Sequence, residues 1–228
     1  MSLHAPSCAE LIRAIDAADS ADAMLDAVEA LAEVRSLDAI PTLIEVLGYN
    51  NPGAAVAAVD GLIQIGEPAV VPLLELMDGY NYTARSWAVR ALAGIGDPRG
   101  LQVLCDAAMT DFSFSVRRSA AKGLGFVRWE QMSQEAIAPA QGQALDTLLE
   151  KIRDEEWIVR YAAVVGLQEL THALIQQLQT SEPSPAVREY GQRIEDAFNQ
   201  SLQTEKQLVV RARIRLAQQE IRHLKTSE

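Results

Sequence analysis

The sequence repeats one short apolar pattern about every thirty residues, and this periodicity limits the possible folds more than any other feature. The first three intervals are 31, 30 and 32 residues, and the fourth is 43, which indicates an insertion between Trp129 and Ala144. A period of this length is typical of a supersecondary unit that stacks on copies of itself. The five copies read AVEAL, AVDGL, AVRAL, AAKGL and AVVGL, ending at Leu31, Leu62, Leu92, Leu124 and Leu167.

A second apolar segment recurs between these copies, as IPTLIEVL (40–47), VVPLLELM (70–77), GLQVLCDA (100–107) and LDTLLEKI (145–152). GEP and GDP separate the two segments, and Gly after one helix with Pro at the start of the next is the usual pattern of helix ends. Apolar residues follow helical spacing, for example at 84, 88, 91, 92 and 95. We therefore predict an all-α solenoid of five to six helix pairs in a right-handed superhelix, with no strands.

The predicted organisation is one domain over 1–228. A capping helix falls within 1–20, the repeats occupy 21–200 with a polar insertion at 130–143, and a C-terminal helix lies within 201–228. A degenerate sixth copy of the repeat is expected around Val187 and Phe198. The C-terminal helix has apolar residues left over, so it either caps the solenoid or holds a partner chain.

Charge and composition exclude several classes of function. The net charge of −11 disfavours a nucleic-acid partner, because a phosphate backbone would be repelled. Cys8 and Cys105 lie far apart, so neither a disulfide framework nor a metal site is expected. The N-terminus lacks the pattern of a signal peptide, and no apolar run approaches the ~20 residues that span a membrane. We therefore expect a soluble, cytoplasmic protein.

Parts of the repeat are similar to a known family. DFSFSVRRSAAKGLG and EEWIVRYAAVVGLQEL resemble the HEAT-like repeat of the phycobilisome bilin lyases. Residues 49–101, with Tyr49-Asn50, Tyr80-Asn81 and ARSWAVRALAGIGDPRG, resemble the F-type subunit of the heterodimeric phycocyanin α-subunit phycocyanobilin lyase. The likeness runs from about Ala9 to Leu170. The predicted architecture is thus a HEAT-like, armadillo-type α-solenoid.

This resemblance implies an enzyme subunit that acts only with an E-type partner. Such heterodimers bind phycocyanobilin as a substrate, with no permanently bound cofactor, and attach it by a thioether to a cysteine of the phycocyanin α-subunit. A related lyase-isomerase subunit carries an adjacent His-Cys pair, whereas His4, His172 and His223 have no such neighbour. Ligation without isomerisation is therefore favoured.

Such a reaction requires a lyase to place the pigment and to ease its protonation. The residue types suited to this are Arg or Lys for the propionates, flat aromatics for the pyrroles, and an acid near the ring nitrogens. We expect Asp111 and Tyr82 to act in catalysis. The expected bilin-binding residues are Tyr49, Asn50, Tyr80, Asn81, Arg85, Trp87, Arg90 and Arg118.

Structural roles compete with these assignments. Arg117, Arg160 and Arg188 share the repeat phase of Arg85, and an Asp precedes two of them by six residues, which is the pattern of an Asp–Arg ladder between repeats. Arg90 departs from the repeat pattern, since one counterpart is Lys122 and the others are not cations.

Other candidates also have structural alternatives. Trp87 falls in the apolar stripe and is expected to be core if it does not bind pigment. Asn50, Asn81 and Asp111 can serve as helix caps. Cys105 is predicted to be a buried thiol.

The alternatives to a lyase subunit are a non-catalytic chaperone for phycobilisome assembly or disassembly, and a HEAT-repeat scaffold for protein interactions. The residues alone, without the resemblance, favour a scaffold, because the sequence contains no catalytic triad, metal cluster or phosphate loop.

Overall fold

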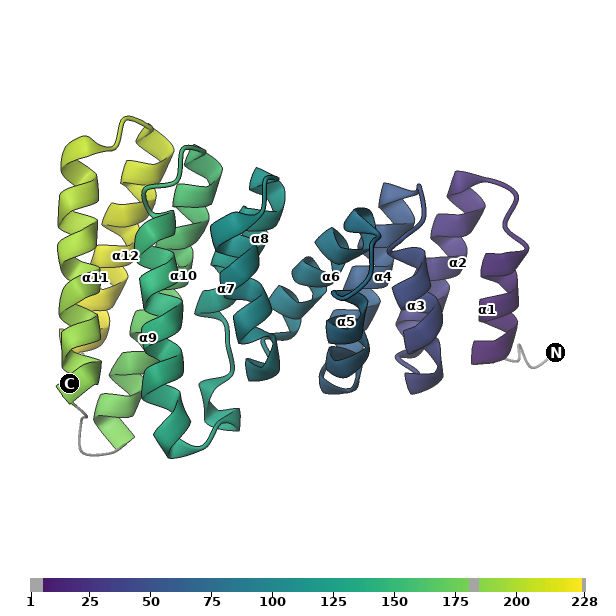
Figure 1. The fold of residues 1–228 in the computed structure, drawn as a ribbon, viewed down its shortest axis with the longest axis horizontal. Coiled ribbons are helices and arrows are strands. Elements are labelled where there is room, and N and C mark those ends of the chain that lie inside the picture. Colours follow the sequence, from purple (N-terminus) through teal and green to yellow (C-terminus); the bar gives the residue numbers. More distant parts are fainter. Residues whose placement is uncertain (1–5, 181–184, 227–228) are drawn as a thin grey trace. The chain divides into compact units, whose positions relative to one another are not determined.

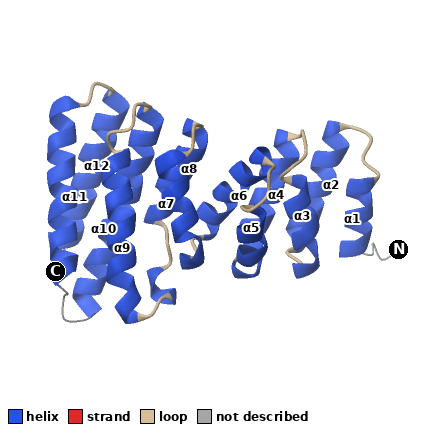
Figure 2. Cartoon of the chain, in the orientation of Figure 1, coloured by secondary structure: helices blue, strands red, loops and turns tan. Residues whose placement is uncertain are grey.

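The computed structural model describes residues 6–180 and 185–226, and every regular element in these ranges is helical (Figures 1 and 2). The helices form two compact units, one within residues 1–95 and the other within residues 96–228. Each unit is built of stacked helix pairs, which places the fold in the α-solenoid class. The all-α prediction is confirmed, and the described residues contain six helix pairs. The single-domain organisation and the right-handed superhelix stay predictions.

The first unit contains three helix pairs, whose second members α2, α4 and α6 pack side by side. The apolar repeat residues form its core, and Val28, Leu62 and Leu92 are at most 1% exposed. The 3-10 turns η1 (Leu37–Ala39) and η2 (Glu67–Ala69) lead from one pair to the next. The pairs are α1 (Cys8–Asp16) with α2 (Ala21–Val34), α3 (Ile40–Val46) with α4 (Pro52–Ile65), and α5 (Val70–Leu76) with α6 (Tyr82–Ile95).

The second unit contains three further pairs, and here α8, α10 and α12 pack side by side. Two glycines set the distance between α8 and α10: a Cβ on Gly125 would lie 2.6 Å from the Cα of Gly166. The 3-10 turns are η3 (Pro98–Gly100) and η4 (Trp129–Gln131). The pairs are α7 (Leu101–Thr110) with α8 (Phe114–Gly125), α9 (Gln134–Lys151) with α10 (Trp157–Thr180), and α11 (Pro185–Thr204) with α12 (Leu208–Thr226).

The structure shows how the insertion folds, and it places one segment differently from the sequence-based expectation. Most of the 130–143 insertion is helical, because residues 134–143 form the first part of α9. The expected sixth copy of the AVxGL helix, around Val187, is α11, which packs against α9. It is α12 that packs beside α10, so the C-terminal helix completes the sixth pair instead of following the repeats.

No single helix in the described ranges is both long and apolar enough to cross a membrane. Pro52–Ile65 and Glu67–Leu76 meet the requirement only when taken together, and they are bent by 119° at their junction.

Candidate functional site

Asparagines position the loops of the first unit. Asn51 accepts a hydrogen bond from the Ala54 N–H at 3.1 Å and donates to the Ala21 carbonyl at 2.9 Å, so it caps α4 and ties it to α2. Asn81 accepts from the Ala84 N–H at 3.2 Å and caps α6 in the same way. The capping alternative for Asn81 is therefore confirmed. For Asn50 it is wrong, because Asn51 occupies the cap position and Asn50 is exposed.

The predicted tyrosines lie at the same edge of this unit. A Cβ on Gly48 would lie 2.9 Å from Asn81 Nδ2, so the loops before α4 and α6 are neighbours. Tyr49 donates to Glu45 Oε1 at 2.9 Å, and burial together with this bond raises the pKa of its phenol. The Tyr80 side chain is fully exposed. Tyr82 is the first residue of α6 and is half-buried.

Trp87 and Arg90 form a cation–aromatic pair on α6. The Arg90 guanidinium lies 5.5 Å from the centre of the Trp87 ring, and both side chains are half-buried. Trp87 is therefore not a fully buried core residue. Arg85 is also half-buried, and it projects from a different side of α6 because five residues separate it from Arg90.

The second unit holds the other two predicted residues. Asp111 ends α7, and its Oδ1 accepts from the Ser113 N–H at 2.8 Å, which orders the loop before α8. Arg118 is half-buried on α8. One turn further along, Lys122 lies 5.8 Å from the centre of the Phe126 ring.

Lys122 is a candidate that the sequence-based list of site residues omits. It stands 32 residues after Arg90, the interval of the repeat, so the same position carries a cation beside an aromatic ring on α6 and on α8. No ion pair involves either cation within the described residues. The quadrupole of the aromatic ring therefore attracts each cation, and the N–H groups of the cation can still bind a carboxylate.

The Asp–Arg ladder is present in the second unit. Arg117 binds Asp154 through Nε and Nη2, at 2.9 and 3.0 Å, and donates through Nη1 to the Asp111 and Phe112 carbonyls. Arg160 repeats the arrangement with Glu205, at 2.6 and 2.9 Å. Each arginine therefore links its own loop to the loop of the next pair.

This ladder shifts the ionisation of its members. The Arg160 hydrogen bonds hold the pKa of the Glu205 carboxyl below its usual value. Burial raises the pKa of Asp154, but the bonds from Arg117 and from the Glu156 N–H outweigh it and leave that pKa lowered. The charged forms are thus favoured in the folded protein. Arg117 and Arg160 have structural roles, as the ladder alternative predicts.

Arg188 is outside the ladder, which corrects that part of the prediction. It is exposed on α11, which packs against both α9 and α10, whereas α12 is the helix that continues the row of α8 and α10. Because α12 takes the next place in the row, the loop before α12 supplies the acid, and that acid is Glu205.

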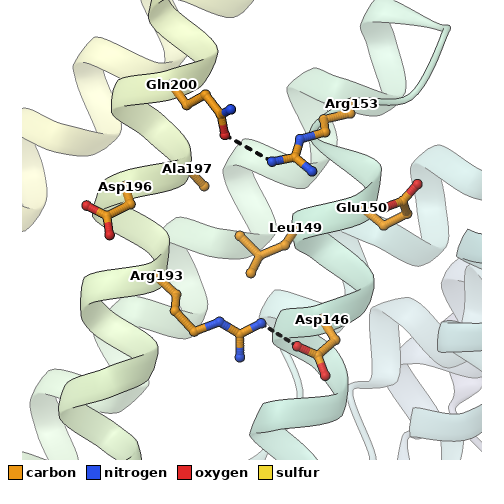
Figure 3. A pocket seen from close by; sticks show the side chains of 8 residues that line it. All are labelled: Asp146, Leu149, Glu150, Arg153, Arg193, Asp196, Ala197 and Gln200. Carbon is orange, nitrogen blue, oxygen red and sulfur yellow. Dashed lines mark hydrogen bonds and ion pairs between the residues drawn. The ribbon is translucent and has the colours of Figure 1, made fainter.

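A groove of about 380 Å³ lies between α9 and α11 (Figure 3). Arg193 donates to Asp146 at 2.6 Å and Arg153 to Gln200 at 3.0 Å, so two bridges cross it. Both arginines are thus engaged in joining the two helices. No predicted site residue lines this groove, whose walls are Asp146, Leu149, Glu150, Arg153, Arg193, Asp196, Ala197 and Gln200.

Other reactive groups are limited in the described part of the chain. Cys105 is buried as predicted, and burial raises the pKa of its thiol, which disfavours the nucleophilic thiolate. The described ranges contain no cluster of three or more His, Cys, Asp or Glu side chains that would hold a metal ion.

The stacked helix pairs define the class of protein. The profile for HEAT repeats matches residues 9–78 and 72–141, more than half of the chain, so this is a HEAT-repeat protein. Within that class, the chain belongs to the phycobilisome bilin lyase family, because it is 46–57% identical to members of that family over most of its length.

Two relatives cover most of both chains. The phycocyanin alpha phycocyanobilin lyase CpcF of Synechocystis sp. (strain Kazusa) is 57% identical over 74% of this chain and 79% of its own. The phycocyanobilin lyase subunit beta of Nostoc sp. PCC 7120 is 46% identical over 92% of this chain and 98% of its own. A chain in the solved complex of CpcE and CpcF of phycocyanin lyase from Nostoc sp. PCC 7120 is 46% identical with a TM-score of 0.68, covering 80% of this chain and 99% of that one.

Proposed function

We propose that this protein is the F-type subunit of a lyase that binds phycocyanobilin and, with an E-type partner, attaches it to the phycocyanin α-subunit. The observation that carries this proposal is the identity of 46–57% to lyase subunits over most of both chains. In this proposal phycocyanobilin is a substrate and not a resident group. In this proposal the protein acts in the cytoplasm.

The reaction forms one C–S bond. A thiolate of the acceptor adds to the ethylidene carbon of ring A, the C=C bond opens into the conjugated system, and that system takes up a proton. The lyase therefore contributes mainly placement, which is worth up to roughly 7–11 kcal/mol in favourable cases. The residues that we propose for placement are the cation–aromatic pairs Arg90 with Trp87 and Lys122 with Phe126, and Arg118. The carboxyl of Asp111 would supply the proton, with Tyr82 beside the pigment, and Tyr49, Asn50, Tyr80, Asn81 and Arg85 would complete the contacts.

The decisive assay is reconstitution. The purified chain, an E-type partner, phycocyanobilin and the apo α-subunit are incubated together, and covalent pigment is detected by zinc fluorescence after denaturing electrophoresis. A fluorescent α-subunit that requires both lyase chains is expected. If pigment attaches equally well without this chain, the proposed function is wrong.

Two variants locate the site. Arg90→Ala loses a charge-assisted contact of about 1.5–3 kcal/mol, so pigment binding should weaken roughly 10- to 150-fold. Asp111→Asn should bind pigment normally but ligate it about 100-fold more slowly. Arg188→Ala, an exposed arginine on α11, is the matched control. Losses of activity that only follow losses of melting temperature would place the site elsewhere.

A further inference from the structure

Helix α12 carries two apolar stripes, although one is enough to fold it. The first contains Val210, Ile214, Ala217 and Ile221, all at most 3% exposed. The second is shorter and points outward: Leu208, Ala212 and Leu216 lie at i, i+4 and i+8, with the exposed Arg215 and Gln219 beside them. Leu208 is 78% exposed and Leu216 46%. A surface helix of a globular protein normally exposes polar residues opposite its buried stripe, so the second stripe indicates an interface.

The apolar surface continues onto the start of α10. Trp157 is the first residue of α10 and Leu208 the first residue of α12, and these helices pack side by side. The ion pair of Arg160 with Glu205 holds their two starts in register. Trp157 is 40% exposed there. We call Trp157, Leu208, Ala212, Arg215 and Leu216 the α12 face.

The charge around this face is opposite to that of the whole protein. The chain has a net charge of −11, yet α12 contains Arg211, Arg213, Arg215 and Arg222 against one acid, Glu220. The Glu220 carboxylate already accepts a hydrogen bond from Gln168 on α10. A partner surface that packs on the exposed apolar residues of α12 therefore meets the arginines around them. Carboxylates on the partner surface would complement these arginines.

We propose that the α12 face is the docking site for an acidic, amphipathic helix of the E-type partner subunit. This inference rests on the proposed function, which supplies the partner. The exposed apolar residues of α12 run from Leu208 to Leu216, about 12 Å along the helix, which seats about two turns of a partner helix. Apolar residues at the centre with charges at the rim are the usual anatomy of such an interface, and Trp and Arg are its commonest anchors.

The test measures the affinity of the purified full chain for a purified E-type subunit by calorimetry. Leu208→Ser combined with Leu216→Ser should raise the Kd about 30-fold or more. Leu37→Ser is the matched control, because Leu37 is 60% exposed on η1 in the first unit. Leu208, Leu216 and Leu37 are all exposed, so the melting temperatures of the variants should match that of the wild type.

A second variant tests the charge. Arg215→Glu should slow association about tenfold at low salt and should flatten the dependence of Kd on ionic strength, because complementary charges steer the encounter. Arg188→Glu, on the exposed side of α11, should leave both unchanged.

The outcomes separate the two proposals. If the wild-type chain does not bind an E-type subunit at all, the proposed function fails and this inference fails with it. If it binds and the double serine variant binds as tightly as Leu37→Ser, only the docking site is wrong. Two other results would also overturn the docking site, provided that affinity for the E-type subunit is kept. In the first, the serine substitutions abolish self-association in sedimentation. In the second, they abolish the absorbance shift of bound phycocyanobilin.

Discussion

Arg117 is the residue whose removal tests the ladder most directly. Its guanidinium makes four hydrogen bonds, two to the Asp154 carboxylate and two to backbone carbonyls of the loop before α8. Arg117→Ala leaves the Asp154 side chain, only 4% exposed, with Lys151 at 3.4 Å and the Glu156 N–H as its remaining partners.

The expected loss follows from that burial. Breaking a buried ion pair by removing one partner costs about 3–5 kcal/mol, because the other charge stays buried. Lys151 keeps part of the compensation, so we expect the lower end, about 3 kcal/mol. For a chain of this size each kcal/mol lowers the melting temperature by about 2–4 °C, which gives a drop of roughly 6–12 °C.

Calorimetric melts of the wild type, Arg117→Ala and Arg117→Lys measure this drop. The lysine keeps the charge but lacks the planar fork, so it should recover only part of the stability. A double-mutant cycle with Asp154→Asn measures the interaction energy of the pair. The losses of stability in the two single variants should not add in the double variant. Pigment ligation well below the melting temperature should stay close to that of the wild type. A drop below about 2 °C, or full additivity in the cycle, would refute the reasoning.

Two further expectations concern the second unit. Gly125→Ala should lower the melting temperature markedly, because its Cβ would lie 2.6 Å from the backbone of Gly166. If the variant melts like the wild type, α8 and α10 can separate at little cost. Gly191→Ala is the control, because a Cβ there would meet no neighbouring atom of the described residues within 4 Å. The lowered pKa values of Asp154 and Glu205 mean that the ladder contributes fully above the unfolded values of about 4 and is lost as pH falls through the lower folded values. Stability should therefore be level from pH 7 to 5 and fall below pH 4, which acid titration followed by circular dichroism would check, and a steady decline beginning near pH 6 would contradict it.

The sequence predicted a residue's role correctly where that role depends on the residue's position within the repeat. The helix pairs follow from the spacing of small and apolar residues, and the pairing of Arg117 with Asp154 follows from their constant phase. The prediction failed where the phase itself slipped. The insertion joins α9 and adds length before α10, and the degenerate stripe at Val187 belongs to the other helix layer. Arg188 was misassigned for that reason alone.

Local register explains the remaining error in the candidate site. The two YN dipeptides look equivalent, but Pro52 fixes the start of α4, so Asn51 and not Asn50 is the counterpart of Asn81. Lys122 is the repeat counterpart of Arg90, but the sequence alone does not indicate an aromatic partner for it. Its ring partner Phe126 is on the next turn, and only the folded helix shows the two side chains in contact.

The two units join their neighbouring helix pairs with different kinds of bond. In the first unit Asn51 reaches the previous pair through one neutral hydrogen bond, whereas in the second unit charged forks clamp one loop to the next. A neutral bond at a wet edge is exchanged for water at little cost, but a fork must release two buried charges together. Local opening should therefore begin among α1 to α4 and stop before α8. The first unit is thus expected to be the more compliant of the two, and the second, with its charged forks, the stiffer.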